Sequence, residues 1–504
     1  MKKEKSITKN SAYYLLYQVF NMVFPFITGI YVARVLLPEA VGMVAYAQNI
    51  AAYFSLMAFL GIPTYGMREI SKVREDKHEL SKVYSELLII NFISTCFFSF
   101  SYLVLIFLVP QFRDHLILYM VTGSSILLNM MNNSWLYEGF EEFRFISIRN
   151  IFFKTLCFFL LVVLVRTKDD YFLYAFTTVL GSAGNNLINM IYAPKFVKFT
   201  TKGLKFKKHL KPVFTFVAVN LAIELYSLVD VTMLGAMKTN KDVAYYSYAN
   251  RIQKILIQVL NSCTIVVVPR FVSYYKKNKL DQFNSLLSNT LEIILVLAIP
   301  MVFGIQVVAK EAIVFLYGEA FLPSADVLRV LVCLLVVSPV GYLLGSRVLL
   351  VTNNENKMAI VVWIGAILNI VGNAVLIPVL SQNGAALASL LSELCVMGLY
   401  VRLGSKYFTL NIRGLDIVKI ISAALIMSGI CWFVGLCISS LTVRLIIQAC
   451  LGVLVYFSIL IVTKEKITTF YFKRLILSKL HEVWRIYERV ISSGNSRSRI
   501  KDNG

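Results

Sequence analysis

The sequence has little charge and no segment that would form a separate soluble domain. Only 15% of its 504 residues are charged, whereas soluble globular proteins contain about 25%. Hydrophobic residues make up 58% of the chain and fall in blocks of about 20 residues or more, each long enough to cross a bilayer as a helix. Segments with the alternating polarity of a membrane barrel strand are absent from the sequence. The sequence therefore predicts an all-α polytopic membrane protein.

The chain also lacks the residue patterns of metal, redox and nucleotide sites. Its eight cysteines all lie in apolar blocks and form no CxxC or Cys/His pattern, so we expect neither disulfides nor zinc. Its four histidines lie in loops or in the C-terminal tail, and the sequence has no Walker loop. We therefore expect no metal, no cofactor and no direct use of ATP, and we interpret the chain as a transporter rather than an enzyme.

Fourteen apolar segments are long enough to span a membrane, and proline inside several of them predicts kinks. From the N-terminus they are 12–36, 42–62, 84–109, 116–136, 146–165, 171–193, 213–236, 243–268, 285–308, 326–350, 358–380, 384–401, 418–438 and 443–463.

The loops between these segments predict the orientation. About 36 of the 50 Lys and Arg residues lie in the two tails and the even-numbered loops, and about 7 lie in the odd-numbered loops. Basic loops stay in the cytoplasm, so we predict that both termini are cytoplasmic. The net charge of +22 then reflects this topology and attraction to anionic membrane lipids. Because the charge is dispersed over loops, it does not indicate a nucleic-acid partner.

One phrase occurs twice in the sequence. VGMVAYAQNI (41–50) and VAYYSYANRI (243–252) share Val, Tyr, Ala and Ile in register. They begin spans of the same predicted orientation, six spans apart. This indicates two parallel lobes of six helices, an arrangement in which transporter lobes rock around a central site.

The repeat suggests a division of the chain into four parts. These are an N-terminal lobe (1–200), a C-terminal lobe (201–410), two extra C-terminal spans (411–463) and a cytoplasmic tail (464–504). The tail contains a basic amphipathic pattern, which predicts a helix that lies on the anionic inner leaflet or packs on the loops.

The chain contains ARVLLPEAVGMVAYAQNIAAYF (33–54), YGMREISK (65–72), WLYEGFEEFRFISIRNIFFK (135–154) and LYSLVDVTMLG (225–235). These stretches resemble Wzx-type flippases of the multidrug, oligosaccharidyl-lipid and polysaccharide exporter superfamily. The resemblance implies a two-lobe fold of twelve core helices, here with two more, in the bacterial cytoplasmic membrane. It also implies a substrate: an undecaprenyl-pyrophosphate-linked oligosaccharide that is moved to the outer leaflet for capsule, O-antigen or a related surface polymer.

Charged side chains inside the predicted spans indicate a site, because each costs about 2.5–3.5 kcal/mol at membrane depth. In span 243–268 the polar residues recur at helical spacing, which puts them on one face. They are Ser247, Arg251, Lys254, Gln258 and Asn261. The first copy of the repeat has Asn49 in place of Arg251. A cationic face suits a pyrophosphate, because Arg binds phosphate in bidentate fashion and Lys acts as a compact charge.

The preceding span supplies two acids, Glu224 and Asp230. The helical rise puts Glu224 about 18 Å and Lys254 about 17 Å from the outer ends, and Asp230 and Arg251 at about 9 and 12 Å. The matching depths predict the pairs Glu224–Lys254 and Asp230–Arg251. These pairs either serve only to hold the two helices together or also face a lumen, where the cations would bind substrate.

Three further charges lie within spans. Arg34 ends the first span and either joins the substrate site or snorkels outward. Lys154 lies about one turn inside its span, and we expect it to snorkel to the cytoplasm. Glu393 is either a hydrogen-bonded interior acid or a proton site. With Glu224 and Asp230 it forms the set of candidates for coupling transport to H⁺ or Na⁺.

We interpret the chain as a flippase for lipid-linked oligosaccharides that works by alternating access. A peptidoglycan-precursor flippase and a drug or cation antiporter of the same superfamily are the alternatives, although a cation exporter should have an acidic cavity. From another class, a membrane glycosyltransferase or polymerase should show a sizeable extracytoplasmic loop or a catalytic domain, and the sequence shows neither.

Overall fold

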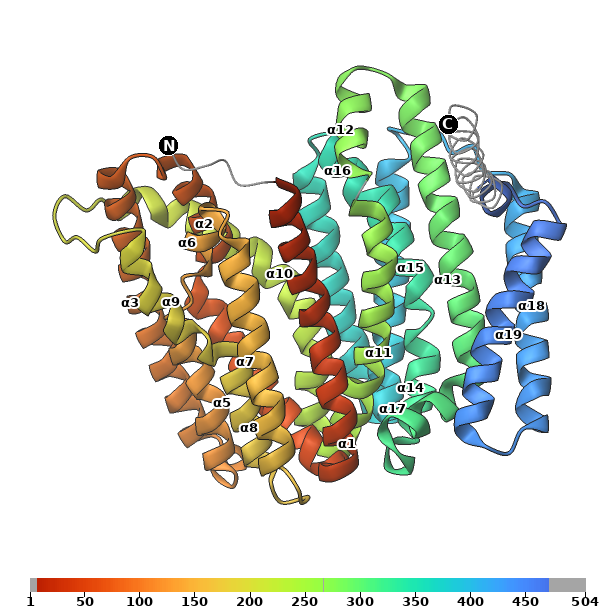
Figure 1. The fold of residues 1–504 in the computed structure, drawn as a ribbon, viewed down its shortest axis with the longest axis horizontal. Helices are drawn as coiled ribbons and strands as arrows, with labels where there is room; N and C mark the ends of the chain where they lie inside the picture. Colours follow the sequence, from red (N-terminus) through yellow and green to blue (C-terminus); the bar gives the residue numbers. More distant parts are fainter. Residues whose placement is uncertain (1–6, 266, 471–504) are drawn as a thin grey trace, which may run out of the picture. The chain divides into compact units, whose positions relative to one another are not determined.

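The computed structural model describes residues 7–265 and 267–470, which form helices joined by short loops, with no strand among them (Figure 1). The basic amphipathic segment predicted in the tail lies outside the described residues. In chain order the helices are α1 (Ile7–Phe59), α2 (Ile62–Val73), α3 (Lys77–Leu108), α4 (Pro110–Arg113), α5 (Leu116–Asn129), α6 (Ser134–Gly139), α7 (Phe143–Leu164), α8 (Tyr171–Val179), a π-helix (Leu180–Gly184), α9 (Asn186–Tyr192), a 3₁₀-helix (Ala193–Lys195), α10 (Lys207–Met237), α11 (Asn240–Ile265), α12 (Val268–Lys276), α13 (Leu280–Tyr317), a 3₁₀-helix (Glu319–Phe321), α14 (Ser324–Leu331), α15 (Leu334–Gly341), a second π-helix (Tyr342–Arg347), α16 (Val348–Val351), α17 (Glu355–Gly404), α18 (Gly414–Cys437) and α19 (Leu441–Val462).

The predicted spans correspond to these helices. At two places where the sequence predicted a loop between spans, the structure has one continuous helix with a bend. The first two spans form α1, which bends at Leu37 (φ 64°, ψ 169°). The eleventh and twelfth form α17, which bends at Ser381 (φ 50°, ψ −130°). Leu37 precedes Pro38, and a residue before proline avoids the helical conformation. The bends therefore lie at the predicted boundaries, but the chain turns there without an intervening loop.

Eight helical segments of the described chain are long and apolar enough to cross a membrane by length and composition. The remaining predicted spans coincide with α5, with α8 and α9 around the first π-helix, with α10 and with α11. α5 is shorter than these segments, and α8 and α9 are separated by the first π-helix. The fold is all-α and polytopic, as predicted, and fourteen spans are consistent with it.

Two short amphipathic helices outside the predicted spans add to the internal repeat. α2 begins Ile62-Pro63 and α12 begins Val268-Pro269, and each has proline in its first turn. Each directly follows the helix that contains a copy of the repeated phrase. Proline is favoured in the first turn because its missing N–H would have no helical partner there. The duplication thus includes the turn that ends the second helix of each copy.

Contacts divide the chain into two compact units. The first contains 1–256, 312–334 and 354–400, and the second contains 257–311, 335–353 and the residues from 401 on. These units do not follow the predicted lobe boundaries. The predicted lobes were defined by the internal repeat, whereas the two units are defined by contacts between residues. The boundaries 1–200, 201–410 and 411–463 stay a prediction.

Aromatic side chains and one buried polar network fix the core of the first unit around α2, α3 and α6. Trp135 and Tyr137 are buried there. Nearby, the buried Glu86 carboxylate accepts hydrogen bonds from His209 Nε2 (2.7 Å) and Lys208 Nζ (2.9 Å). His209 Nδ1 lies 2.8 Å from the Tyr65 hydroxyl. This network ties the start of α10 to α3 and α2.

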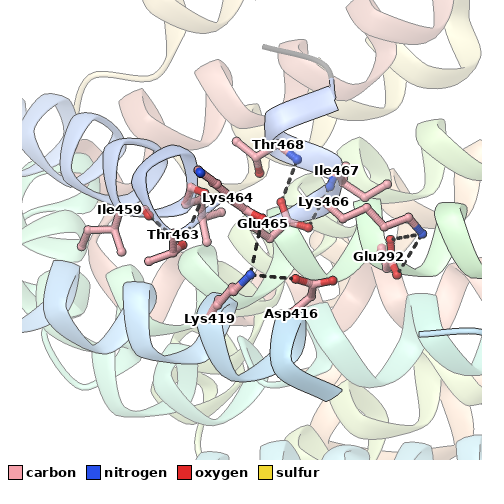
Figure 2. Close-up of polar contacts among 11 residues, drawn as sticks. Glu292, Asp416, Lys419, Ile459, Thr463, Lys464, Glu465, Lys466, Ile467 and Thr468 are labelled. Carbon is pink, nitrogen blue, oxygen red and sulfur yellow. Dashed lines mark hydrogen bonds and ion pairs between the residues drawn. The ribbon is translucent and has the colours of Figure 1, made fainter. Parts of the chain in front are cut away.

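In the second unit α18 and α19 run side by side and pack with α13 (Figure 1). The Tyr456 hydroxyl donates to the Val296 carbonyl at 2.8 Å. Figure 2 shows how the chain after α19 is fastened: Lys466 pairs with the buried Glu292 at 3.2 Å, and Lys419 bonds both Asp416 and the Lys464 carbonyl. These contacts hold the residues that directly follow α19 against α13 and α18.

Candidate functional site

The two copies of the repeated phrase pack against each other in the first unit. A Cβ added to Gly42 in α1 would lie 1.7 Å from the carbonyl oxygen of Asn240, at the start of α11. One added to Gly235 in α10 would lie 2.2 Å from the Tyr46 ring. Only glycine permits approaches this close. The close packing brings the first helix of each copy beside the second helix of the other.

Asn49 in the first copy and Arg251 in the second occupy the same position of the repeat and make equivalent contacts. In the first copy Asn49 donates to the Leu228 carbonyl of α10 at 3.0 Å. In the second copy Arg251 donates to the Pro25 carbonyl of α1 at 3.1 Å. Each residue thus bonds the backbone of the other copy's first helix. Arg251 keeps this contact while adding a charge that Asn49 lacks.

The cationic face predicted on α11 begins with Arg251 and Lys254. Arg251 is half-buried, and its guanidinium lies 4.8 Å from the centre of the Tyr248 ring and interacts with Tyr174. Lys254 is exposed, and the acids that act on its charge are Asp230 and Glu224. The structure therefore brings these four charged residues together within the first unit.

Asp230 is buried in a network of neutral donors. Its carboxylate accepts hydrogen bonds from Ser389 (2.6 Å), Asn373 (2.7 Å), Asn369 (3.0 Å) and the Tyr246 hydroxyl. A carboxylate has about four acceptor positions, so these donors fill it. Among the described residues Asp230 and Arg251 form no ion pair, contrary to the prediction. The two side chains bond different neighbours: Asp230 bonds residues of α11 and α17, and Arg251 bonds the Pro25 carbonyl of α1.

The other predicted residues lie apart from this network. Arg34 is exposed and donates to the Phe315 carbonyl. Glu224 is exposed on α10, and Glu393 is half-buried on α17. Gln258 and Asn261 follow Lys254 along α11 but belong to the second unit. Their place on the cationic face rests on helical spacing alone.

Sequence reasoning missed the partners of Asp230 and the surroundings of Lys154. Asn369 and Asn373 are one helical turn apart in an apolar span, a spacing that could have marked them as an interior pair. Lys154 does not snorkel as expected, because its ammonium bonds the Asn21 side chain of α1 and lies 5.8 Å from the centre of the Phe24 ring. It lines a cavity between α1, α7 and α8.

A family model described as "Polysaccharide biosynthesis protein" matches residues 7–275, more than half of the chain. The chain belongs to this family. The family match, with the relatives below, confirms the resemblance found in the sequence.

Two curated relatives illustrate this polysaccharide biosynthesis family. A "Putative O-antigen transporter" of Escherichia coli (strain K12) is 23% identical over 419 residues, covering 78% of this chain and 95% of that protein. The "Probable low-salt glycan biosynthesis flippase Agl15" of Haloferax volcanii is 28% identical over 235 residues, 46% of this chain and 50% of that one.

Solved structures with the same fold come from two groups of membrane transporter. The "Lipid II flippase MurJ, inward closed conformation" matches with a TM-score of 0.69 and 16% identity, covering 91% of this chain and 98% of that one. A multidrug resistance MATE family transporter of the MOP superfamily, facing inward, gives a TM-score of 0.58 and 14% identity over 79% and 95% of the chains. At these identities the likeness concerns the fold, and the fold is that of a multi-pass membrane protein.

Proposed function

We propose that the protein is a flippase that carries an undecaprenyl-pyrophosphate-linked oligosaccharide across the bacterial cytoplasmic membrane for a surface polysaccharide. The observation that carries this proposal is the cationic pair Arg251–Lys254 on the second copy of a duplicated helix. The E. coli and Haloferax volcanii relatives are named for O-antigen transport and glycan biosynthesis, which supports an oligosaccharide cargo.

The chemistry of the pair suits a diphosphate. A guanidinium offers five N–H donors in a fixed fork, and Arg251 uses one nitrogen on the Pro25 carbonyl. Its remaining N–H donors lie beside Tyr174 and Tyr248, and we propose that a phosphate oxygen pair takes two of them in bidentate fashion. Lys254, exposed beside it, adds a second positive charge. Alternating access of two lobes, with both termini in the cytoplasm, would present these cations first to one leaflet and then to the other.

Two alternatives from the same superfamily are less well supported. A drug or cation antiporter should prefer an acidic cavity, whereas α11 presents two cations. A peptidoglycan-precursor flippase would share the lipid diphosphate, and the fold likeness to MurJ does not separate the two substrates. The relative named for O-antigen spans far more of this chain than the 38% matched by Bacillus subtilis MurJ, which favours the first proposal.

Transport against a gradient needs an energy source, and the acids Asp230, Glu224 and Glu393 within the predicted spans are the candidates for coupling it to H⁺ or Na⁺. Asp230 is the strongest of them, because it joins α10, α11 and both halves of α17 and also acts on Lys254. A change in its charge would be felt by all these helices and by the cationic pair. Glu224 and Glu393 are the further candidates.

The test replaces Arg251 by Gln in the strain that carries the gene. Removing a charged hydrogen-bonding contact costs about 1.5–3 kcal/mol, or roughly ten- to a hundred-fold in affinity. Arg251→Gln should therefore reduce surface polymer and raise the amount of lipid-linked oligosaccharide on the cytoplasmic leaflet, with normal protein abundance. Arg329→Gln is the control, because Arg329 is a half-buried arginine that pairs with Asp326 one helical turn earlier and does not belong to the α11 face. Normal export by Arg251→Gln at normal abundance would contradict the proposal.

A further inference from the structure

A separate cavity lies within the first unit, beside Arg251 but on other helices. It has a volume of about 120 Å³ and lies between the N-terminal half of α1, α7, α8 and the first π-helix. Sites for drug-sized ligands measure roughly 300–1,000 Å³. This cavity is therefore sized for one ring of a ligand and not for an extended chain.

The cavity has one cation and a set of hydroxyl groups that present acceptors. Thr178 and Ser182 donate their hydroxyl protons to helix carbonyls at 2.9 Å each, and Thr28 does so at 3.0 Å. Their oxygen lone pairs consequently face the cavity, where a ligand hydroxyl can donate to them. Lys154 supplies the donor. An ammonium has three N–H groups, and Lys154 uses one of them on the Asn21 side chain.

The remaining walls are apolar and include an aromatic ring. Phe24, Cys157 and Leu161 line the cavity, and Gly181 of the π-helix keeps one side free of a side chain. A face of C–H groups edged by hydroxyls is the chemistry of a pyranose ring. The cavity matches this chemistry, because its apolar walls can pack on the face of the ring. Its acceptors and its one charged donor can bond the sugar hydroxyls.

The cavity shares two residues with the surroundings of Arg251. Pro25 lines it and also accepts the hydrogen bond of Arg251 at 3.1 Å. Tyr174 lines it and interacts with the guanidinium. A diphosphate held by Arg251 therefore has the cavity directly beside it, and the group that adjoins the diphosphate in a lipid-linked oligosaccharide is its first sugar.

We propose that this cavity is a subsite for the sugar attached to the pyrophosphate, with Lys154, Thr178 and Ser182 bonding its hydroxyls. The proposal rests on the function proposed above and adds the recognition of one sugar to that of the diphosphate. The lipid anchor and the diphosphate are common to many such substrates, so a subsite for the first sugar would contribute selectivity.

The experiment compares two ligands on the purified full-length protein in nanodiscs. One is undecaprenyl pyrophosphate without sugar. The other is the lipid-linked oligosaccharide extracted from the parent strain after deletion of the gene. The wild-type protein should bind the sugar-bearing ligand about tenfold more tightly, the effect of one or two good hydrogen bonds. Lys154→Met and, separately, Thr178→Val should remove this margin while affinity for undecaprenyl pyrophosphate stays unchanged.

The controls separate the subsite from the proposed function. Thr215→Val changes a threonine of α10 that makes the same kind of bond to its own helix, to the Lys211 carbonyl, and it should keep the margin. A wild-type protein that binds neither ligand would overturn the function itself. The subsite proposal would be wrong if the wild type bound both ligands equally, or if both cavity variants kept the difference in affinity between the two ligands. Neither result would contradict the proposed flippase function. A purely structural Lys154 would weaken both ligands together.

Discussion

Asp230 shows what a single buried acid does in this molecule. Asp230 is nearly inaccessible, with 5% exposed, and two amides and two hydroxyls from α11 and α17 donate to its carboxylate. Hydrogen bonds to a charged group contribute more than those between neutral groups. The cluster therefore stabilises the packing of α10 and α11 on α17, in addition to any role in coupling.

We expect Asp230→Asn to lower the free energy of unfolding by about 1.5–3 kcal/mol. The new NH₂ group can only donate, and it would replace an oxygen that accepts hydrogen bonds from neighbouring donors. Thermal unfolding of the detergent-solubilised protein measures this change. Asp326→Asn is the control, since Asp326 forms an exposed ion pair with Arg329 and such pairs contribute about 0–1 kcal/mol. Equal effects of the two variants would mean that the donors do not stabilise a carboxylate.

His209 makes the stability of the first unit depend on pH. Burial lowers the pKa of His209 below its usual 6.5, and the opposing effect of Glu86 is smaller because Lys208 pairs with the same carboxylate. The folded protein therefore binds a proton at lower pH than the unfolded chain does. Stability should fall as the pH drops below about 6.5, until the folded-state pKa is passed.

The measurement is thermal unfolding between pH 7.5 and 5.5 in wild type and in His209→Gln. Glutamine still donates to Glu86 and accepts from Tyr65, yet it does not titrate, so the variant should lose less stability over this range. His78→Gln, at an exposed position, should behave like the wild type. An identical pH profile in His209→Gln would show that another group is responsible.

Residue patterns in the sequence predict which side chains share the face of one helix, but they do not predict the contacts between helices. Arg251 and Lys254 were found because helical spacing fixes which residues share a face. The 1.5 Å rise also fixed their depth, but it says nothing about rotation of one helix against another. This is why Asp230 was matched with Arg251 although it bonds Asn369 and Asn373, about 140 residues further along.

At the scale of helices, the sequence did not predict the backbone geometry at the two bends or at the first π-helix. The sequence placed boundaries near Leu37 and Ser381, where polar or proline residues interrupt apolar runs, but it could not tell a bend from a loop. The π-helix at Leu180–Gly184 was read as part of a regular span, because an extra residue in one turn leaves no mark on the apolar pattern. The cavity beside Lys154 lies at this π-helix and was missed with it.

The repeated helices pack so closely that glycine is required at Gly42. We expect Gly42→Ala to destabilise the protein by about 1–3 kcal/mol or more, because overpacking a tight contact forces the backbone to move and the obstructing atom is the Asn240 carbonyl oxygen. Yield and thermal stability after solubilisation measure this effect.

Gly398→Ala is the matched control for this helix contact. Gly398 lies in α17 with nothing within 4 Å of an added Cβ, so alanine there should be neutral or stabilise the helix by about 0.5–1 kcal/mol. Should Gly42→Ala be as stable as Gly398→Ala, the two copies of the repeat would not be packed at this point.

At the scale of the whole molecule, composition and the length of the apolar blocks carried the correct inference. Low charge and long apolar blocks predicted an all-α membrane protein, because lipid leaves helices as the means of satisfying the backbone. The family match and the fold likeness to membrane transporters agree with that prediction. Orientation is a different matter. The orientation of the chain in the membrane depends on which loops the cell retains in the cytoplasm. The packing of the helices does not reveal it.

The orientation can be tested with single cysteines in a variant that lacks the eight native ones. Lys202→Cys and Lys168→Cys both lie at exposed loop positions, the first in the basic segment between α9 and α10 and the second between α7 and α8. Because positively charged loops stay inside, an impermeant maleimide added to intact cells should label Lys168→Cys and should label Lys202→Cys only after permeabilisation. The reverse labelling pattern would contradict the predicted topology, in which both termini are cytoplasmic.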